Sequence, residues 1–133
     1  MNRSMVSKKD GFSLIEVLIA LTFLAIGLLA IASLQVTSVR GNFFSNSLMQ
    51  ATYVAQDRLE FLRVRPLPPY SFDSDPFLSG GNHPDGNTTI SGVVFNRSYT
   101  IANDASGYKK ITYTVTWNDG VDHHITFSTI KSP

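Results

Sequence analysis

The sequence predicts an α+β chain in which one long N-terminal helix precedes an antiparallel sheet. The first observation is an apolar run, Val17 to Leu34, after which apolar residues recur at helical spacing as far as Leu62. The second is the C-terminal third of the chain, where β-branched and aromatic residues alternate with threonine. One long helix followed by a loop and consecutive strands indicates a helical spine packed on a meandering sheet.

The apolar run is suited to lipid. It holds 18 residues, of which only Thr22 and Ser33 are polar. As a helix it reaches roughly 27 Å, at about 1.5 Å per residue. A bilayer core is about 30 Å thick. Three basic residues precede the run, and they predict a cytoplasmic N-terminus with the rest of the chain across the membrane: Arg3, Lys8 and Lys9.

Glu16 stands at the head of this run and does not suit a simple anchor. An ionised side chain at the centre of a membrane helix costs about 2.5–3.5 kcal/mol, and less near the interface. Such a residue is expected to have a partner or a function. The alternative is an interfacial carboxylate in the first helical turn, where the helix dipole favours negative charge. Glu16 alone leaves both interpretations open.

The residues around Glu16 resemble a known signal. The stretch from Gly11 to Glu16, after a short basic leader and before a long apolar run, resembles the class III signal of type IV pilins and type II secretion pseudopilins. The resemblance implies that a prepilin peptidase cuts after Gly11. It implies that Phe12 becomes the N-methylated N-terminus and that Glu16 pairs with the terminal amine of a neighbouring subunit. It is specific, because a glycine, an aromatic residue, a spaced glutamate and an apolar run must coincide.

Two further stretches, Ala55 to Arg63 and the hairpin that contains Trp117, resemble PilV-like minor pilins. The resemblance implies a minor type IV pilin that supports assembly and function of a pilus that reaches the surface or spans the periplasm. The implied partners are other pilins, major and minor, the prepilin peptidase, the inner-membrane assembly machinery and membrane lipid before assembly. Many major pilins close a C-terminal loop with a disulfide, whereas this chain has no cysteine.

Three alternatives stay open at this point. A type II secretion minor pseudopilin would share the N-terminal signal. A single-pass membrane-anchored binding domain would keep its leader. An ordinary secretory cleavage site could lie before Ser33, because Ala30 to Ala32 has the small-x-small form. Against this last alternative, the apolar run is longer than a usual signal core and would carry Glu16.

The sequence predicts three segments: a leader at residues 1–11, a hydrophobic transmembrane or assembly helix at 12–40, and an exported globular domain at 41–133. The spine is predicted to continue into the third segment and to end at Arg65, because the residue before Pro66 disfavours helix. Glu60 can reach Arg63 one turn later. The predicted core-facing stripe of the spine comprises Phe44, Leu48, Ala51, Ala55, Leu59 and Leu62.

Proline and glycine fill the stretch from Pro66 to Asn87, which predicts a loop without regular structure. We expect its aromatic residues Tyr70, Phe72 and Phe77 to attach it to the domain. A loop of this length is either functional or disordered. In this chain it is either a contact surface for neighbours in the filament or a poorly ordered connector.

Strands are predicted for the rest of the chain. The first pair is Thr88 to Phe95 and Ser98 to Ile101, with a tight turn at Asn96-Arg97. The second pair is Lys110 to Trp117 and Val121 to Ile130. The sequence Asn118-Asp119-Gly120 between them favours a hairpin, since glycine tolerates positive φ. Residues predicted on the core face are Ile111, Tyr113, Val115 and Trp117, followed by Ile125, Phe127 and Thr129.

Nothing in the sequence indicates an enzyme, a metal site or a cofactor. His123 and His124 point to opposite faces of a strand, so we expect them and His83 to be solvated. Asp119 and Asp122 flank a turn but lack the calcium-loop pattern. The net charge of +1 gives no argument for nucleic acid.

Overall fold

A computed structural model describes residues 11–66, 74–103 and 107–132. It contains helix α1 (Leu14–Val64) and strands β1 (Gly81–Ile90), β2 (Val93–Asn103), β3 (Lys109–Asn118) and β4 (Asp122–Lys131). The predicted α+β class is confirmed, and the helix is slightly shorter than the predicted 12–65. The chain divides into two compact units, Met1–Gly41 and Asn42–Pro133, and α1 contributes to both.

In the first unit, α1 begins directly after Ser13. The carbonyl of Ser13 accepts hydrogen bonds from the amides of Glu16 at 3.0 Å and Val17 at 3.2 Å. The polar side chains in the apolar part of the helix are also satisfied, because the hydroxyl groups of Thr22 and Ser33 donate to the carbonyls of Leu18 and Ala30, each at 2.8 Å. Hydroxyl groups bonded to the preceding turn are tolerated in apolar surroundings.

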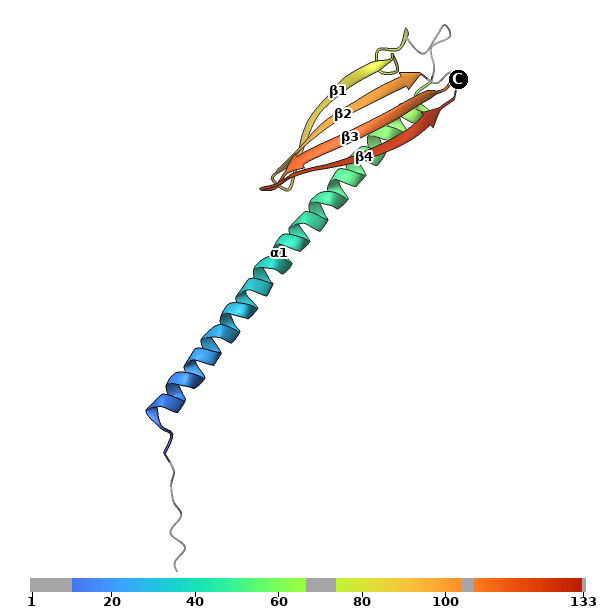
Figure 1. Ribbon diagram of the computed structural model, residues 1–133. Coiled ribbons are helices and arrows are strands. Elements are labelled where there is room, and N and C mark those ends of the chain that lie inside the picture. The colour runs from blue at the N-terminus through green and yellow to red at the C-terminus, as the bar shows by residue number, and fades with distance from the viewer. Residues whose placement is uncertain (1–10, 67–73, 104–106, 133) are drawn as a thin grey trace, which may run out of the picture. The chain divides into compact units, whose positions relative to one another are not determined.

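In the second unit, the four strands form one antiparallel sheet in the order β1-β2-β3-β4, and the C-terminal part of α1 packs on one of its faces (Figure 1). The predicted stripe on α1 is largely confirmed. Ala51, Ala55 and Leu62 are buried in the core, Leu48 and Leu59 are half-buried against it, and Phe44 is exposed. The core side of the sheet is formed chiefly by Val93, Phe95, Tyr99, Ile101, Ile111, Tyr113, Val115 and Trp117.

The predicted β3–β4 hairpin is confirmed. Asn118 pairs with Asp122, and Gly120 has a φ of 107°. The side-chain oxygen of Asn118 accepts a hydrogen bond from the Gly120 amide at 2.9 Å. The turn therefore depends both on the conformational freedom of Gly120 and on this local hydrogen bond.

Two predictions about the first hairpin are wrong. The predicted loop at 66–87 ends earlier, because β1 already begins at Gly81. Proline is tolerated there because β1 is an edge strand, and a bulge between Pro84 and Asn87 absorbs the irregularity. The predicted turn at Asn96-Arg97 lies within β2, and the chain instead turns at Ser91-Gly92.

The Ser91-Gly92 turn has positive φ at both residues, 52° and 82°. This conformation suits the right-handed twist of a two-residue hairpin, but serine is an unusual residue for it. The unusual residue explains why the turn is difficult to read from the sequence.

The segment before β1 is attached to the end of α1, as predicted for Phe77. Its ring contacts that of Phe61 edge to face at 6.3 Å, and the Arg65 guanidinium lies 4.4 Å from the Phe77 ring centre. The other two residues of this prediction, Tyr70 and Phe72, lie outside the described residues.

Candidate functional site

The predicted cleavage site lies just outside the helix. Gly11, Phe12 and Ser13 are exposed and are not helical, and the Phe12 side chain is 83% exposed. A Cβ atom added at Gly11 would meet no heavy atom within 4 Å. The fold around residue 11 therefore does not require glycine, and a requirement for glycine would have to come from a partner.

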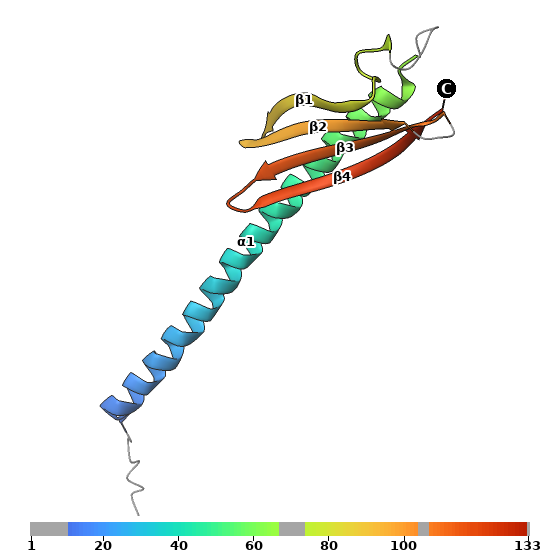
Figure 2. The same ribbon diagram turned by 45° about the horizontal axis from the view of Figure 1, so that its top comes forward.

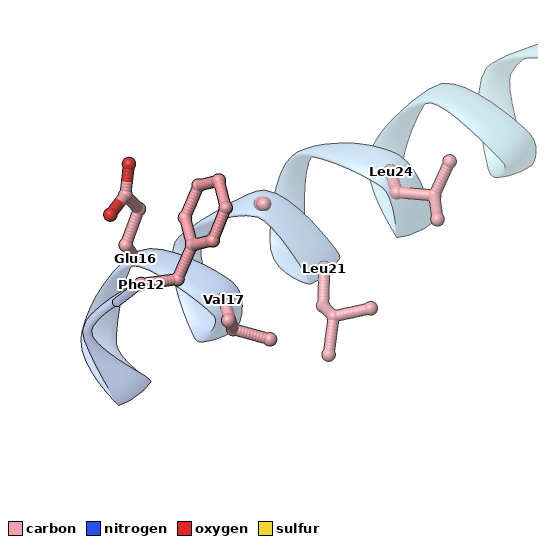
Figure 3. Close-up of a pocket in the computed structure, with 6 residues that line it drawn as sticks. Phe12, Glu16, Val17, Leu21 and Leu24 are labelled. Carbon is pink, nitrogen blue, oxygen red and sulfur yellow. The ribbon is translucent and has the colours of Figure 1, made fainter. Parts of the chain in front are cut away.

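Glu16, in the first turn of α1, lies beside Phe12, which precedes the helix. Together with four apolar residues they line an open groove on the first turns of α1: Val17, Ala20, Leu21 and Leu24. Figure 3 shows the Phe12 ring beside the Glu16 side chain, whose carboxylate points away from Val17 and Leu21. Among the described residues, no cation lies within ion-pairing distance of Glu16. The site thus offers an exposed carboxylate next to an apolar surface.

The helix behind Glu16 is uncovered on all sides. An 18-residue window of α1 has a mean hydropathy of 2.7, and none of it is buried within the chain. By length and composition, α1 is able to cross a membrane. A helix that is apolar all round requires lipid or other helices around it.

Residues 6–32 match a family described as the prokaryotic N-terminal methylation motif. This is the class III signal motif of type IV pilin-like proteins. The match covers 27 of the 133 residues, and it includes Gly11, Phe12 and Glu16. No curated protein and no solved structure matched the chain.

The methylation motif supports a type IV pilin-like or pseudopilin-like protein. Together with the apolar helix it fits a membrane-anchored pilin. The long helix packed on a four-stranded antiparallel sheet is a pilin-like arrangement.

The second unit contains a buried polar cluster that the sequence did not indicate. The carboxylate of Asp85, on β1, accepts two hydrogen bonds from Arg58, at 2.8 and 2.6 Å, and one from the hydroxyl of Tyr113 at 2.5 Å. Arg97 donates to the Asp85 carbonyl at 2.8 Å. The Asp85 side chain is only 9% exposed. These contacts join α1 to three strands: β1, β2 and β3.

Titration of this cluster follows from its contacts. Burial works against the charged form of Asp85, but hydrogen bonds from Arg58 and Tyr113 outweigh it, so the pKa of Asp85 is lowered. Burial and then the hydrogen bond to Asp85 raise the pKa of Tyr113 far above its ordinary value. At neutral pH the cluster is an ion pair with a bound phenol, which is suited to holding the fold together. Asp85 falls inside the predicted loop, which is why it was missed.

A second cluster closes the C-terminal end of α1. Lys131, the last residue of β4, is buried, and its amine donates to the carbonyls of Arg63 at 2.5 Å and Arg65 at 2.7 Å. Cations stabilise helix C-termini through such contacts. Arg65 itself pairs with Asp75 at 2.7 Å, and Glu60 pairs with Arg63 at 3.7 Å as predicted.

The histidines are less solvated than predicted. His83 stacks on Tyr99 and bonds to the Ser79 carbonyl at 2.7 Å, and His123 stacks on Trp117. Only His124 is exposed as expected. No group of residues suited to bind a metal is found within residues 11–66, 74–103 and 107–132.

Proposed function

We propose that the chain is a minor type IV pilin of the PilV-like kind, processed by a prepilin peptidase and incorporated into a pilus. The observation that carries the proposal is the match of residues 6–32 to the methylation motif, at the head of a long apolar helix. The partners would be other pilins, the peptidase, the inner-membrane assembly machinery and membrane lipid. Its role would be to support pilus assembly and function rather than catalysis.

Cleavage would occur between Gly11 and Phe12. The exposed, non-helical backbone at residues 11–13 supports this step, because a segment outside the helix is accessible to a peptidase. Cleavage would leave the new amine of Phe12 at the start of α1, and methylation would modify that amine. The leader would remain on the cytoplasmic side, in keeping with its basic residues.

Glu16 would then fix the position of the subunit in the filament. Its carboxylate is exposed and has no cation partner among the described residues. The Phe12 amine of a neighbouring subunit would supply the opposite charge. Breaking a buried ion pair by removing one partner costs about 3–5 kcal/mol. A helix inserted out of register would bear a similar cost.

Intact-mass measurement of the protein purified from its native host tests processing. The expected product lacks residues 1–11 and carries one extra methyl group on Phe12. Gly11→Ala should be cut poorly. Because a Cβ atom at residue 11 meets nothing within 4 Å, a defect would report on the peptidase rather than on folding. A mature N-terminus at Ser33, or an uncleaved chain, would overturn the proposal.

Comparison of Glu16→Ala with Glu60→Ala tests the assembly role. Glu60 is an exposed carboxylate in the second unit and is a matched control. Glu16→Ala should leave export and cleavage unchanged while lowering the amount of the chain in sheared filaments. Glu60→Ala should leave export, cleavage and the amount in filaments unchanged. Equal incorporation of the two variants would contradict the role of Glu16.

A type II secretion minor pseudopilin is the second candidate, because the methylation motif supports both classes. Deletion of the protein separates them. A minor pilin predicts fewer or impaired surface filaments, while the main subunit stays in the membrane. A pseudopilin predicts loss of protein secretion with surface filaments unchanged. Quantitative mass spectrometry of purified filaments would show low abundance for a minor pilin.

A further inference from the structure

The two edges of the sheet in the second unit differ. Strand β1 contains Pro84, which has no amide hydrogen to donate, and a bulge follows it. Both features discourage further strand pairing. Strand β4 lies at the opposite edge, outermost in Figure 2, and contains neither proline nor glycine. Within the described residues, β4 pairs only with β3. Between Asp122 and Lys131 it contains no aspartate, glutamate, lysine or arginine.

The apolar side chains on the inner face of β4 are only partly covered. Ile125 and Phe127 are partly buried against the core, as is Ile90 on β1. A shallow groove runs there between α1 and β4, lined by Gln56, Leu59, Glu60, Arg63 and Thr129. An open strand edge and a partly uncovered apolar seam therefore coincide.

A second copy of the chain fits this edge poorly. Phe44 lies 4.9 Å from His123, so the chain enters this unit beside the β3–β4 turn. Antiparallel pairing of two β4 strands would put these entry points at opposite ends of the joined sheet, whereas subunits of one filament, on the proposed function, would enter from the same end. In parallel pairing, the helix of the second copy would lie on the opposite face of the joined sheet. Phe127 of one copy would then lie on the same face as the polar Thr126 of the other copy. Strand β1 of a second copy is blocked by Pro84.

We propose that β4 binds an extended segment of a different protein chain, which adds a fifth strand to the sheet. Main-chain hydrogen bonds would provide affinity, as in other cases of strand addition. Residues on the inner face of the segment would be apolar, to cover Ile125 and Phe127. Those on the outer face would be small and polar, to match Thr126 and Ser128. Asp122 is exposed, so the segment would carry lysine or arginine at that end.

Site-specific photo-crosslinking of the full chain in native membranes tests this proposal. A photoreactive residue is placed at Thr126 on β4 or, as a matched control, at Thr89 on β1; both threonines are exposed. The expected result is an adduct with a different chain from residue 126 and none from residue 89. The crosslinked peptide of the partner should alternate apolar and small polar residues. Ser128→Lys, which puts a charge on the edge, should reduce the adduct at least tenfold.

Hydrogen exchange distinguishes strand addition from a face contact. Amide exchange of residues 122–131 should slow at least tenfold in the co-purified complex relative to the chain alone in detergent, while residues 81–90 stay unchanged. Adducts of two copies, equal adducts from residue 89, or an adduct without slowed exchange would each overturn the proposal. None of these outcomes bears on cleavage after Gly11, so failure here is distinct from failure of the proposed function.

Discussion

The Asp85 cluster predicts a large loss of stability for Asp85→Asn. The substitution keeps the size of the side chain but removes the charge that pairs with Arg58. It also replaces one carboxylate oxygen with an amide that cannot accept a hydrogen bond. Arg58 and Tyr113 would then have to compete for the remaining oxygen, while Arg97 would still bond to the main-chain carbonyl.

The magnitude follows from burial and partners. Breaking a buried ion pair costs about 3–5 kcal/mol when the remaining charge is left without compensation. Here the Arg58 side chain is 26% exposed, so water can hydrate part of it and lower this cost. We therefore expect the free energy of unfolding to fall by about 2–4 kcal/mol. The matched control Glu60→Gln breaks an exposed pair and should cost under about 0.5 kcal/mol.

Urea unfolding of a fragment spanning residues 42–133, which contains the whole buried core, provides the assay. The contribution of Asp85 should depend on pH. The pKa of Asp85 is lowered in the folded state. The stabilisation that Asp85 provides is therefore fully present above its pKa in the unfolded chain, about 3.9, and is lost as the pH falls through its pKa in the folded chain. The gap between wild type and Asp85→Asn should therefore narrow in acid. A loss no larger than that of Glu60→Gln at pH 7 would refute this reasoning.

The same fragment tests two further features of the fold. Leu62→Ala should lower the free energy of unfolding by about 2–5 kcal/mol, because Leu62 is only 1% exposed. Leu59→Ala should lower it by less, because Leu59 is half-buried. Equal losses for the two variants in urea unfolding would contradict the packing of α1 on the sheet. Gly92→Val should lower the free energy of unfolding by about 1–3 kcal/mol, because Gly92 has a φ of 82° that a β-branched residue rarely adopts. The control Thr89→Val, on the exposed face of β1, should change stability little. A Gly92→Val variant as stable as this control would argue against the observed turn.

The elements with strong periodicity could be predicted from the sequence. The second half of α1 and the core face of β3 repeat apolar residues at the spacing of a helix or a strand, so local pattern and final packing agree. The first half of α1 was predicted from its continuous apolar run instead. The motif at Gly11, Phe12 and Glu16 was recognisable for another reason, since several unusual residue types coincide there at fixed spacing. The family match at residues 6–32 includes all three.

The first hairpin could not be predicted in the same way. Pro84 and Gly86 normally interrupt strands, and they are accommodated here because β1 is an edge strand with a bulge. The partnership of Asp85 with Arg58 spans 27 residues of sequence and leaves no local signal. Its effect depends on which side of the sheet the helix covers, which is a property of the tertiary structure alone.

The contact of Lys131 with the end of α1 has a consequence for the order in which the fold is completed. Its amine reaches the carbonyl of Arg63, 68 positions earlier in the chain. A chain that crosses a membrane N-terminus first would deliver β4 after α1 and the other three strands. Until then the end of α1 lacks its cap, and the apolar face of α1 lacks part of the sheet that covers it. The end of α1 can therefore be capped only after β4 has paired with β3, and Lys131→Ala should leave the helix end uncapped.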